Sequence, residues 1–120
     1  MLHYVSLKVA DIDRSASFYD SMLGPLGWRR QEEGAGAVGW GLTRAVFYIE
    51  RDESQRPGFG EISFAAKSIP AVKASFESGL ENGGEPVAEP GSAPHLGNGN
   101  YAARLRDPDG YVVELVVAHN

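Results

Sequence analysis

The chain repeats itself, because a shift of 57 positions lays its second half over its first. Under this shift the strand residues Ser6 and Leu7 meet Ser63 and Phe64. The further matched pairs are Ile12 with Ile69, Tyr19 with Phe76, Leu23 with Leu80, and Gly27 with Gly84. Any two strand–helix units look somewhat alike, but matching glycines behind matching helices favour duplication of one supersecondary unit.

Each half is predicted to run strand, helix and then three strands. In residues 4–9, polar and apolar side chains alternate, which is typical of a strand with one apolar face. Asp11 or Asp13 caps a predicted helix with an apolar stripe that ends at Gly24. Pro70 opens the second helix, where its missing N–H costs little. The predicted strands are residues 4–9, 28–33, 38–42, 45–50, 61–66, 85–88, 101–106 and 111–117, with a Pro- and Gly-rich loop at 89–99.

Both halves are predicted to belong to a single domain, since neither a linker nor a low-complexity segment separates them. Module 1 covers about residues 1–56 and module 2 about residues 57–120. A helix covers one face of each half's sheet, and the opposite face is too polar for a dry core. The residues predicted on that opposite face are Tyr4, Ser6 and Lys8 in the first half and Glu61 and Ser63 in the second. A partly polar, concave sheet face predicts a ligand cavity.

Composition excludes several classes of protein. Lys and Arg total 11 against 16 Asp and Glu, a formal charge of −5, whereas a nucleic-acid surface needs a clustered basic excess. Apolar runs stay well below the ~18 residues of a membrane span. The lack of cysteine excludes disulfides, thiolate metal ligands and a cysteine nucleophile. Because residues 1–9 do not read as a signal peptide, we expect a cytoplasmic protein that binds neither nucleic acid nor membrane.

Three segments carry a resemblance to a known family. They are residues 4–11 (YVSLKVAD) with Arg14-Ser15 and Phe18-Tyr19 behind them, residues 61–66 (EISFAA), and residues 107–115 (DPDGYVVEL). Through these segments, and nearly end to end, the chain resembles the vicinal oxygen chelate superfamily. Its members include glyoxalase I, bleomycin-resistance proteins and extradiol dioxygenases.

The resemblance implies an α+β fold in which two βαβββ modules form a cupped eight-stranded mixed sheet with the helices on the outside. It also implies a small-molecule ligand and a divalent metal inside the cup (Mg²⁺, Mn²⁺, Ni²⁺ or Zn²⁺), without an organic cofactor. A homodimer is expected, and the modules pair either within one chain or between two.

The family takes its metal ligands from the first, fourth, fifth and eighth strands. Glu114 stands at the last of these positions, and a carboxylate among valines and leucine needs a partner or a metal. The alternative is that Glu114 faces solvent or pairs with a cation such as Lys8. Glu61 stands where the family usually has histidine, and its carboxylate suits Mg²⁺ or Mn²⁺ better than zinc. The alternative for Glu61 is a plain surface position.

The two remaining ligand positions match the family less well. Tyr4 aligns with the first, and His3, one residue earlier, fits a ligand role only if a bulge shifts it to the other face. Otherwise His3 is a frayed terminal residue. Glu50 is the candidate on the fourth strand, with Tyr48 on the same face, and ordinary loop chemistry is the alternative for Glu50.

Other residues are predicted to shape the cavity. Lys8 and Arg104 are cations that would hold a carboxylate, the arginine as a bidentate fork, unless both lie on a solvated face. The aromatic candidates for ligand contact are Trp40, Tyr48 and Tyr101, although aromatic residues of small domains are more often core. His95 is a candidate acid or base at the cavity mouth, with a solvated loop histidine as the alternative.

Two functions follow. The first is a glyoxalase-like enzyme related to lactoylglutathione lyase, in which Glu61 and Glu114, with Glu50 or His3, hold a divalent metal that binds a small oxygenated substrate. In this hypothesis Glu114 or His95 moves the proton. The alternative is a metal-free small-molecule binding or sequestration protein of the bleomycin-resistance type. A vestigial cavity is the third interpretation.

Overall fold

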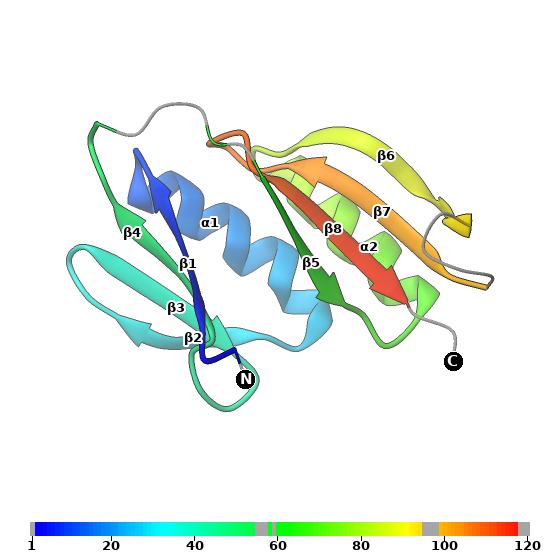
Figure 1. Cartoon of the computed structure of the whole chain (residues 1–120), viewed down its shortest axis with the longest axis horizontal. Coiled ribbons are helices and arrows are strands. Elements are labelled where there is room, and N and C mark those ends of the chain that lie inside the picture. The colour runs from blue at the N-terminus through cyan, green and yellow to red at the C-terminus, as the bar shows by residue number, and fades with distance from the viewer. Residues whose placement is uncertain (1, 55–57, 59, 95–98, 118–120) are drawn as a thin grey trace.

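The two halves fold into the same order of elements in a computed structural model, which describes residues 2–54, 58, 60–94 and 99–117 (Figure 1). The first half contains β1 (Val5–Val9), α1 (Ile12–Leu23), a short 3₁₀ helix η1 (Gly24–Leu26), β2 (Arg29–Glu33), β3 (Ala37–Gly41) and β4 (Phe47–Arg51). The second half contains β5 (Glu61–Ala65), α2 (Ile69–Glu81), β6 (Glu85–Ser92), β7 (Tyr101–Arg106) and β8 (Val112–Val117). The predicted α+β fold with two βαβββ modules is confirmed.

Each half builds one four-stranded mixed sheet with the same topology. The strand orders are β1-β4-β3-β2 and β5-β8-β7-β6. The pairs β1/β4 and β5/β8 are parallel, and the remaining pairs are antiparallel. Both helices lie behind the two sheets in Figure 1, where β1 and β5, each an edge strand of its sheet, face one another. The side of the sheets opposite the helices is therefore uncovered.

Alternation along the strands places the core between the sheets and the helices. On the first sheet Phe47 and Ile49 are buried, and Leu7 packs against them. On the second sheet Val113 and Leu115 have no exposed surface. From α1, the fully buried aliphatic and aromatic side chains are Phe18, Tyr19, Met22 and Leu23. Burying an aliphatic or aromatic side chain of this size contributes about 1.5–3 kcal/mol to the free energy of unfolding. The buried face of α1 therefore stabilises a core that both modules share.

Side-chain caps fix where the two helices begin. Of the two aspartates predicted as caps, Asp11 does so: its side chain accepts a hydrogen bond from the Arg14 amide. Ser68 caps α2 by accepting from the Ala71 amide, with Pro70 in the first turn. Such caps contribute about 0.5–2 kcal/mol each. Among the described residues, neither helix has the length and apolar character needed to span a membrane.

The strand β6 is longer than predicted. The sequence indicated a strand only to Ala88, but β6 runs to Ser92 along the edge of its sheet. Its register to β7 shifts twice, between Pro86 and Ala88 and between Ala88 and Gly91. An edge strand tolerates proline because an N–H that points away from the sheet needs no partner. Proline and glycine therefore suggested a loop where the chain is an irregular edge strand.

Candidate functional site

The carboxylate of Glu114 lies on the uncovered face of the second sheet. Its neighbours Val113 and Leu115 occupy the helix side, which puts Glu114 on the opposite side. The residue is nevertheless only 5% exposed, and its Oε1 accepts a hydrogen bond of 2.7 Å from Ser63 Oγ. The carboxylate on the final strand is thus almost completely shielded from bulk water.

Glu61 and Arg104 form an ion pair on the same face. Arg104 Nη2 donates to Glu61 Oε1 at 2.5 Å. Arg104 also stands opposite Glu114 in the β7/β8 register, and its Nε is buried without a hydrogen-bond partner among the described atoms. The second sheet therefore carries two carboxylates, of which Arg104 pairs with Glu61 and Ser63 binds Glu114.

The first sheet carries a second neutralised pair. Lys8 Nζ donates to Glu50 Oε2 at 2.5 Å, and Ser6 Oγ donates to Glu50 Oε1 at 3.0 Å. The Lys8 hydrogen bond and then the Ser6 hydrogen bond hold the pKa of Glu50 below its ordinary value. Glu50 in turn raises the pKa of Lys8. Lys8 is thus paired with Glu50, not with Glu114.

Strand register shows which residues of module 1 match the acids of module 2. Ser6 pairs with Tyr48, and its repeat mate Ser63 pairs with Glu114. Tyr48 is therefore the counterpart of Glu114, and the shift of 57 makes Tyr4 the counterpart of Glu61. Glu50, predicted as the fourth-strand ligand, lies two residues further along the strand.

The two tyrosines form an aromatic patch instead of an acidic pair. The Tyr4 and Tyr48 rings meet edge-on with centroids 5.3 Å apart, and the His3 ring lies 5.6 Å from Tyr4. Tyr48 lies flat over Gly39, where an added Cβ would come within 2.6 Å of the ring. The Tyr48 hydroxyl donates to Glu32. The repeat has thus diverged into one aromatic and one acidic half.

The residues expected to hold a divalent metal do not fit a metal site within one chain. Over residues 2–54, 58, 60–94 and 99–117, three or more histidine, aspartate or glutamate side chains never gather as metal ligands would. Glu50 and Glu61 each bind a cation, and Glu114 binds a serine hydroxyl. Of the four expected ligands, His3 and Glu50 belong to module 1 and Glu61 and Glu114 to module 2, the same division as the family's four ligand strands. Among the described residues, these side chains therefore do not form a metal site.

Two of the predicted ligand-contacting aromatics lie on the helix side. Trp40 is fully buried between Tyr19 and Phe47, and its Nε1 donates to Asp20 at 2.9 Å. Tyr101 packs against the same core. Their position follows from the period of two along a strand, because Tyr101 shares its side with Ala103 and Leu105. His95 lies outside the described residues.

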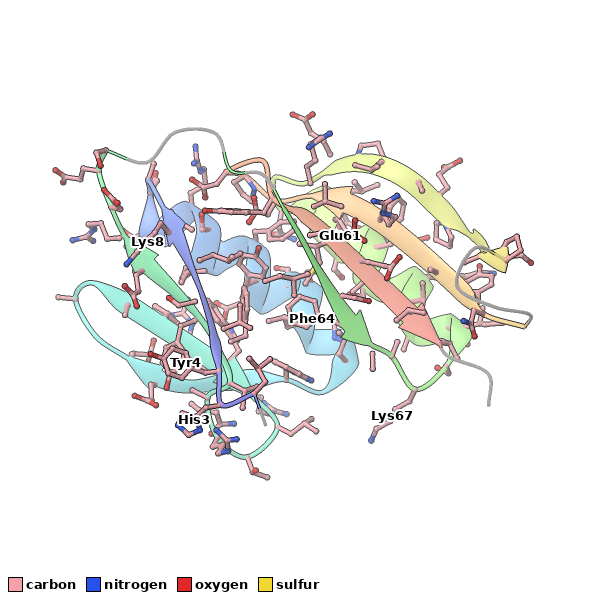
Figure 2. All side chains as sticks on the ribbon, in the orientation of Figure 1. His3, Tyr4, Lys8, Glu61, Phe64 and Lys67 are labelled. Carbon is pink, nitrogen blue, oxygen red and sulfur yellow. The ribbon has the colours of Figure 1, made fainter. Side chains whose placement is uncertain are left out.

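An apolar cavity of about 230 Å³ opens between β1 and β5. Its aromatic lining residues are His3, Tyr4, Trp28, Phe47 and Phe64. Phe64 meets the rings of Trp28 and Phe47 edge-on, with centroids 5.4 and 5.3 Å away. Figure 2 shows His3 and Tyr4 at the start of β1 and Phe64 on β5. The sequence predicted Tyr4 on the cavity face and His3 among the metal ligands. It did not indicate Trp28, Phe47 or Phe64 as cavity residues, since they come from separate segments.

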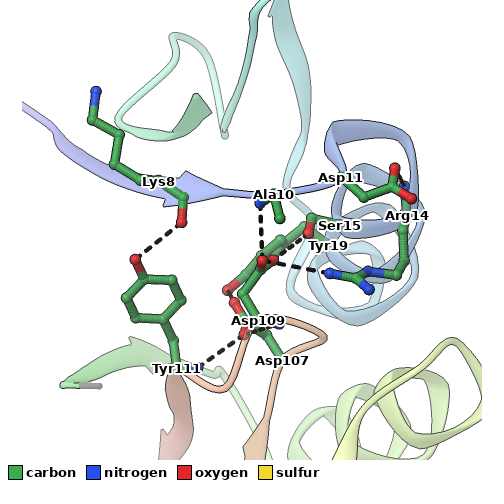
Figure 3. A network of polar contacts seen from close by, with 9 residues as sticks. All are labelled: Lys8, Ala10, Asp11, Arg14, Ser15, Tyr19, Asp107, Asp109 and Tyr111. Carbon is green, nitrogen blue, oxygen red and sulfur yellow. Dashed lines mark hydrogen bonds and ion pairs between the residues drawn. The ribbon is translucent and has the colours of Figure 1, made fainter. Parts of the chain in front are cut away.

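The DPDG turn at residues 107–110 links the two modules and does not line the cavity. Asp109 accepts hydrogen bonds from the Ala10 amide and the Ser15 hydroxyl, and it forms an ion pair with Arg14 (Figure 3). Asp107 accepts from the hydroxyl of Tyr19. Burial raises the pKa of Asp107, although the Tyr19 hydrogen bond acts against this rise. The turn of module 2 is therefore fastened to the start of α1.

Comparison with known proteins assigns the family. The model of the Glyoxalase/Bleomycin resistance protein/Dioxygenase superfamily matches residues 1–115. The chain belongs to this superfamily, as the sequence resemblance predicted.

Individual relatives agree with that assignment. Lactoylglutathione lyase of Salmonella typhimurium (strain LT2) is 32% identical, over 98% of this chain and 92% of its own length. Lactoylglutathione lyase GLX1 of Arabidopsis thaliana is 28% identical, and the chain spans only 42% of its length. A crystal structure of a glyoxalase/bleomycin resistance protein from Albidiferax ferrireducens T118 matches with a TM-score of 0.84 and 29% identity, over 98% of each chain.

Proposed function

We propose that this protein binds a small, ring-containing molecule in the cavity between β1 and β5 and needs no metal to do so. The observation that carries the proposal is the aromatic lining of that cavity, in which Phe64 meets both Trp28 and Phe47 edge-on. Apolar walls with a few polar groups are what small-molecule sites present.

The state of the carboxylates supports the same proposal. Each acid that would serve as a metal ligand already has an internal partner, and stripping Glu61 from Arg104 or Glu50 from Lys8 would leave an arginine or lysine unpaired. The aromatic pair Tyr4 and Tyr48 occupies the two positions that match Glu61 and Glu114. This arrangement favours stacking of a ring over chelation of an ion.

Fluorescence tests the proposal. Protein dialysed against EDTA is titrated with the neutral probe 2-naphthamide, and we expect saturable quenching that does not change when Mg²⁺, Mn²⁺, Ni²⁺ or Zn²⁺ is added. The signal reports on Trp28, so Trp28→Phe should remove it while the buried Trp40 still emits. Binding that appears only after a metal is returned would contradict the proposal.

A matched pair of variants locates the probe. Ala65 lines the cavity and is exposed, so Ala65→Leu should fill space and weaken binding by about tenfold, equivalent to ~1.4 kcal/mol. Ala88→Leu makes the same change on the exposed edge strand β6, outside the lining, and should leave the affinity unchanged.

Glyoxalase-like catalysis is the second candidate, because Glu114 is buried on the uncovered face and curated relatives are named lactoylglutathione lyase. In this case Glu114 would take and return a proton on a small oxygenated substrate. The test is conversion of the hemithioacetal of methylglyoxal and glutathione, with and without each divalent metal. Activity that disappears in Glu114→Gln, with the fold intact, would favour this candidate over simple binding.

A further inference from the structure

We infer that the cavity selects a planar aromatic molecule that carries an acidic group, with Arg44 as its anchor. This inference rests on the proposed function, because it names the class of ligand for the same cavity. It follows from the charge of the cavity lining, from an Arg44 guanidinium that has no carboxylate partner among the described residues, and from the orientation of the Ser63 hydroxyl.

The charge of the lining differs from that of the whole chain. The chain has a formal charge of −5, yet among the described residues that line the cavity there is neither aspartate nor glutamate. Arg44 carries the one permanent charge in that lining, and it is positive. An anion would therefore meet a favourable site here in an otherwise acidic protein.

The guanidinium of Arg44 is available to a ligand. Its Nη1 donates to the backbone oxygen of His3 at 3.4 Å, and no described carboxylate lies within ion-pair distance. Arg30 and Arg104, by contrast, are held by carboxylates. A free guanidinium presents a planar fork that matches a carboxylate with two parallel hydrogen bonds.

A tight turn fixes Arg44 beside the cavity. The chain reverses between β3 and β4, and a Cβ added at Gly41 would lie 1.8 Å from the backbone oxygen of Arg44. Glycine is therefore required at this position for the turn to close. The backbone of Arg44 is held in place while its side chain stays exposed.

The orientation of the Ser63 hydroxyl determines which end of the ligand lies at Ser63 and which end lies at Arg44. Its hydroxyl donates to Glu114, so on the cavity side its oxygen can only accept a hydrogen bond. An acidic group would be repelled at that end by the Glu114 carboxylate. The acid of the ligand therefore belongs at the Arg44 end, and a hydroxyl or N–H group suits the Ser63 end.

The size of the cavity limits the ring system. Its volume of about 230 Å³ lies below the roughly 300–1,000 Å³ typical of sites for drug-sized ligands. One ring or two fused rings therefore fit between the aromatic walls, where edge-on and offset contacts are favourable.

Two probes with the same ring system separate charge from stacking. Isothermal titration calorimetry compares 2-naphthoate with neutral 2-naphthamide at about 0.15 M salt, where distant surface charges are screened. We expect naphthoate to bind roughly tenfold more tightly, as a charge-assisted hydrogen bond to an arginine allows. Arg44→Gln should remove this preference, because losing the guanidinium weakens naphthoate binding far more than naphthamide binding.

The matched control is Arg51→Gln, which removes the same charge from an exposed residue at the other end of β4. It should keep the full preference for naphthoate. Equal binding of the two probes by the unaltered protein, or a preference that survives Arg44→Gln, would overturn the inference and leave the proposed function standing. Failure of both probes to bind would overturn the inference and the proposed function together.

Discussion

At the scale of single residues, the divergence of the repeat explains the site. The same register position holds Tyr48 in one module and Glu114 in the other, although Ser6 and Ser63 beside them are unchanged. An aromatic ring stacks on another ring, whereas a carboxylate binds a cation or accepts a hydrogen bond. We therefore interpret the first module as the half that carries the aromatic pair and the second as the half that carries the acidic pair, while the cavity between β1 and β5 takes aromatic side chains from both.

The ion pair between Lys8 and Glu50 makes a prediction about pH. Because the pKa of Glu50 is lowered from 4.5, its stabilising contribution is present above pH 4.5 and is lost as the pH falls through the lowered folded-state pKa. Carbon-detected NMR of the side-chain carboxyl should show this low titration midpoint. Lys8→Met should move the midpoint upward, whereas Lys73→Met, on α2, should not. An unchanged midpoint in Lys8→Met would contradict the assigned cause.

Asp109 makes a prediction about stability. Asp109→Ala removes the acceptor of the buried Ser15 hydroxyl and of the Ala10 amide, so the free energy of unfolding should fall by about 2–4 kcal/mol. Urea unfolding followed by circular dichroism measures this loss. Asp13→Ala removes an exposed acid from the first turn of α1 and should cost about 1 kcal/mol or less. Similar losses in both variants would show that the buried network is not the cause.

At the scale of elements, the tight turn between β3 and β4 is the feature most sensitive to a single methyl group. Gly41→Ala would drive a Cβ into the Arg44 carbonyl, and overpacking of this kind costs about 1–3 kcal/mol. Gly36→Ala meets open space and should change the free energy of unfolding by less than about 0.5 kcal/mol. Thermal unfolding of the two variants checks the difference, and a stable Gly41→Ala would show that the turn opens freely.

Elements were also what the sequence predicted best, for a physical reason. Helix caps, glycine stops and strand alternation are local signals. Both helices followed from them, as did the buried face of α1 that contains Phe18 and Tyr19. The extent of β6 did not follow, because proline disfavours a central strand but not an edge strand. Edge and centre are properties of the assembled sheet.

The candidate site was less predictable than the fold. Alternation alone places Tyr101 on the side of Leu105, and this signal was available in the sequence. The choice between Glu50 and Tyr48 was not available, because both share a face and only the β1/β4 register separates them. The cavity is equally non-local, since Trp28, Arg44 and Phe64 meet only when the two modules pack.

At the scale of the whole molecule, the assembly state is a proposal that rests on the family. The sheets leave one side uncovered, and a homodimer is the arrangement expected for a chain of this family and length. Light scattering coupled to size-exclusion chromatography should give about twice the chain mass of 12.9 kDa. A mass equal to a single chain would contradict the proposed homodimer. The cavity between β1 and β5 would then be formed by one chain alone. Residence in the cytoplasm is likewise proposed, and fractionation of the source cells tests it.

The most direct measurement is a crystal structure of the EDTA-treated protein soaked with 2-naphthoate. The prediction is difference density for the rings between β1 and β5, against Trp28 and Phe64, with the carboxylate on Arg44. Density for the probe over Glu114 on the uncovered face, seen only after a divalent metal is added and bound there, would contradict it.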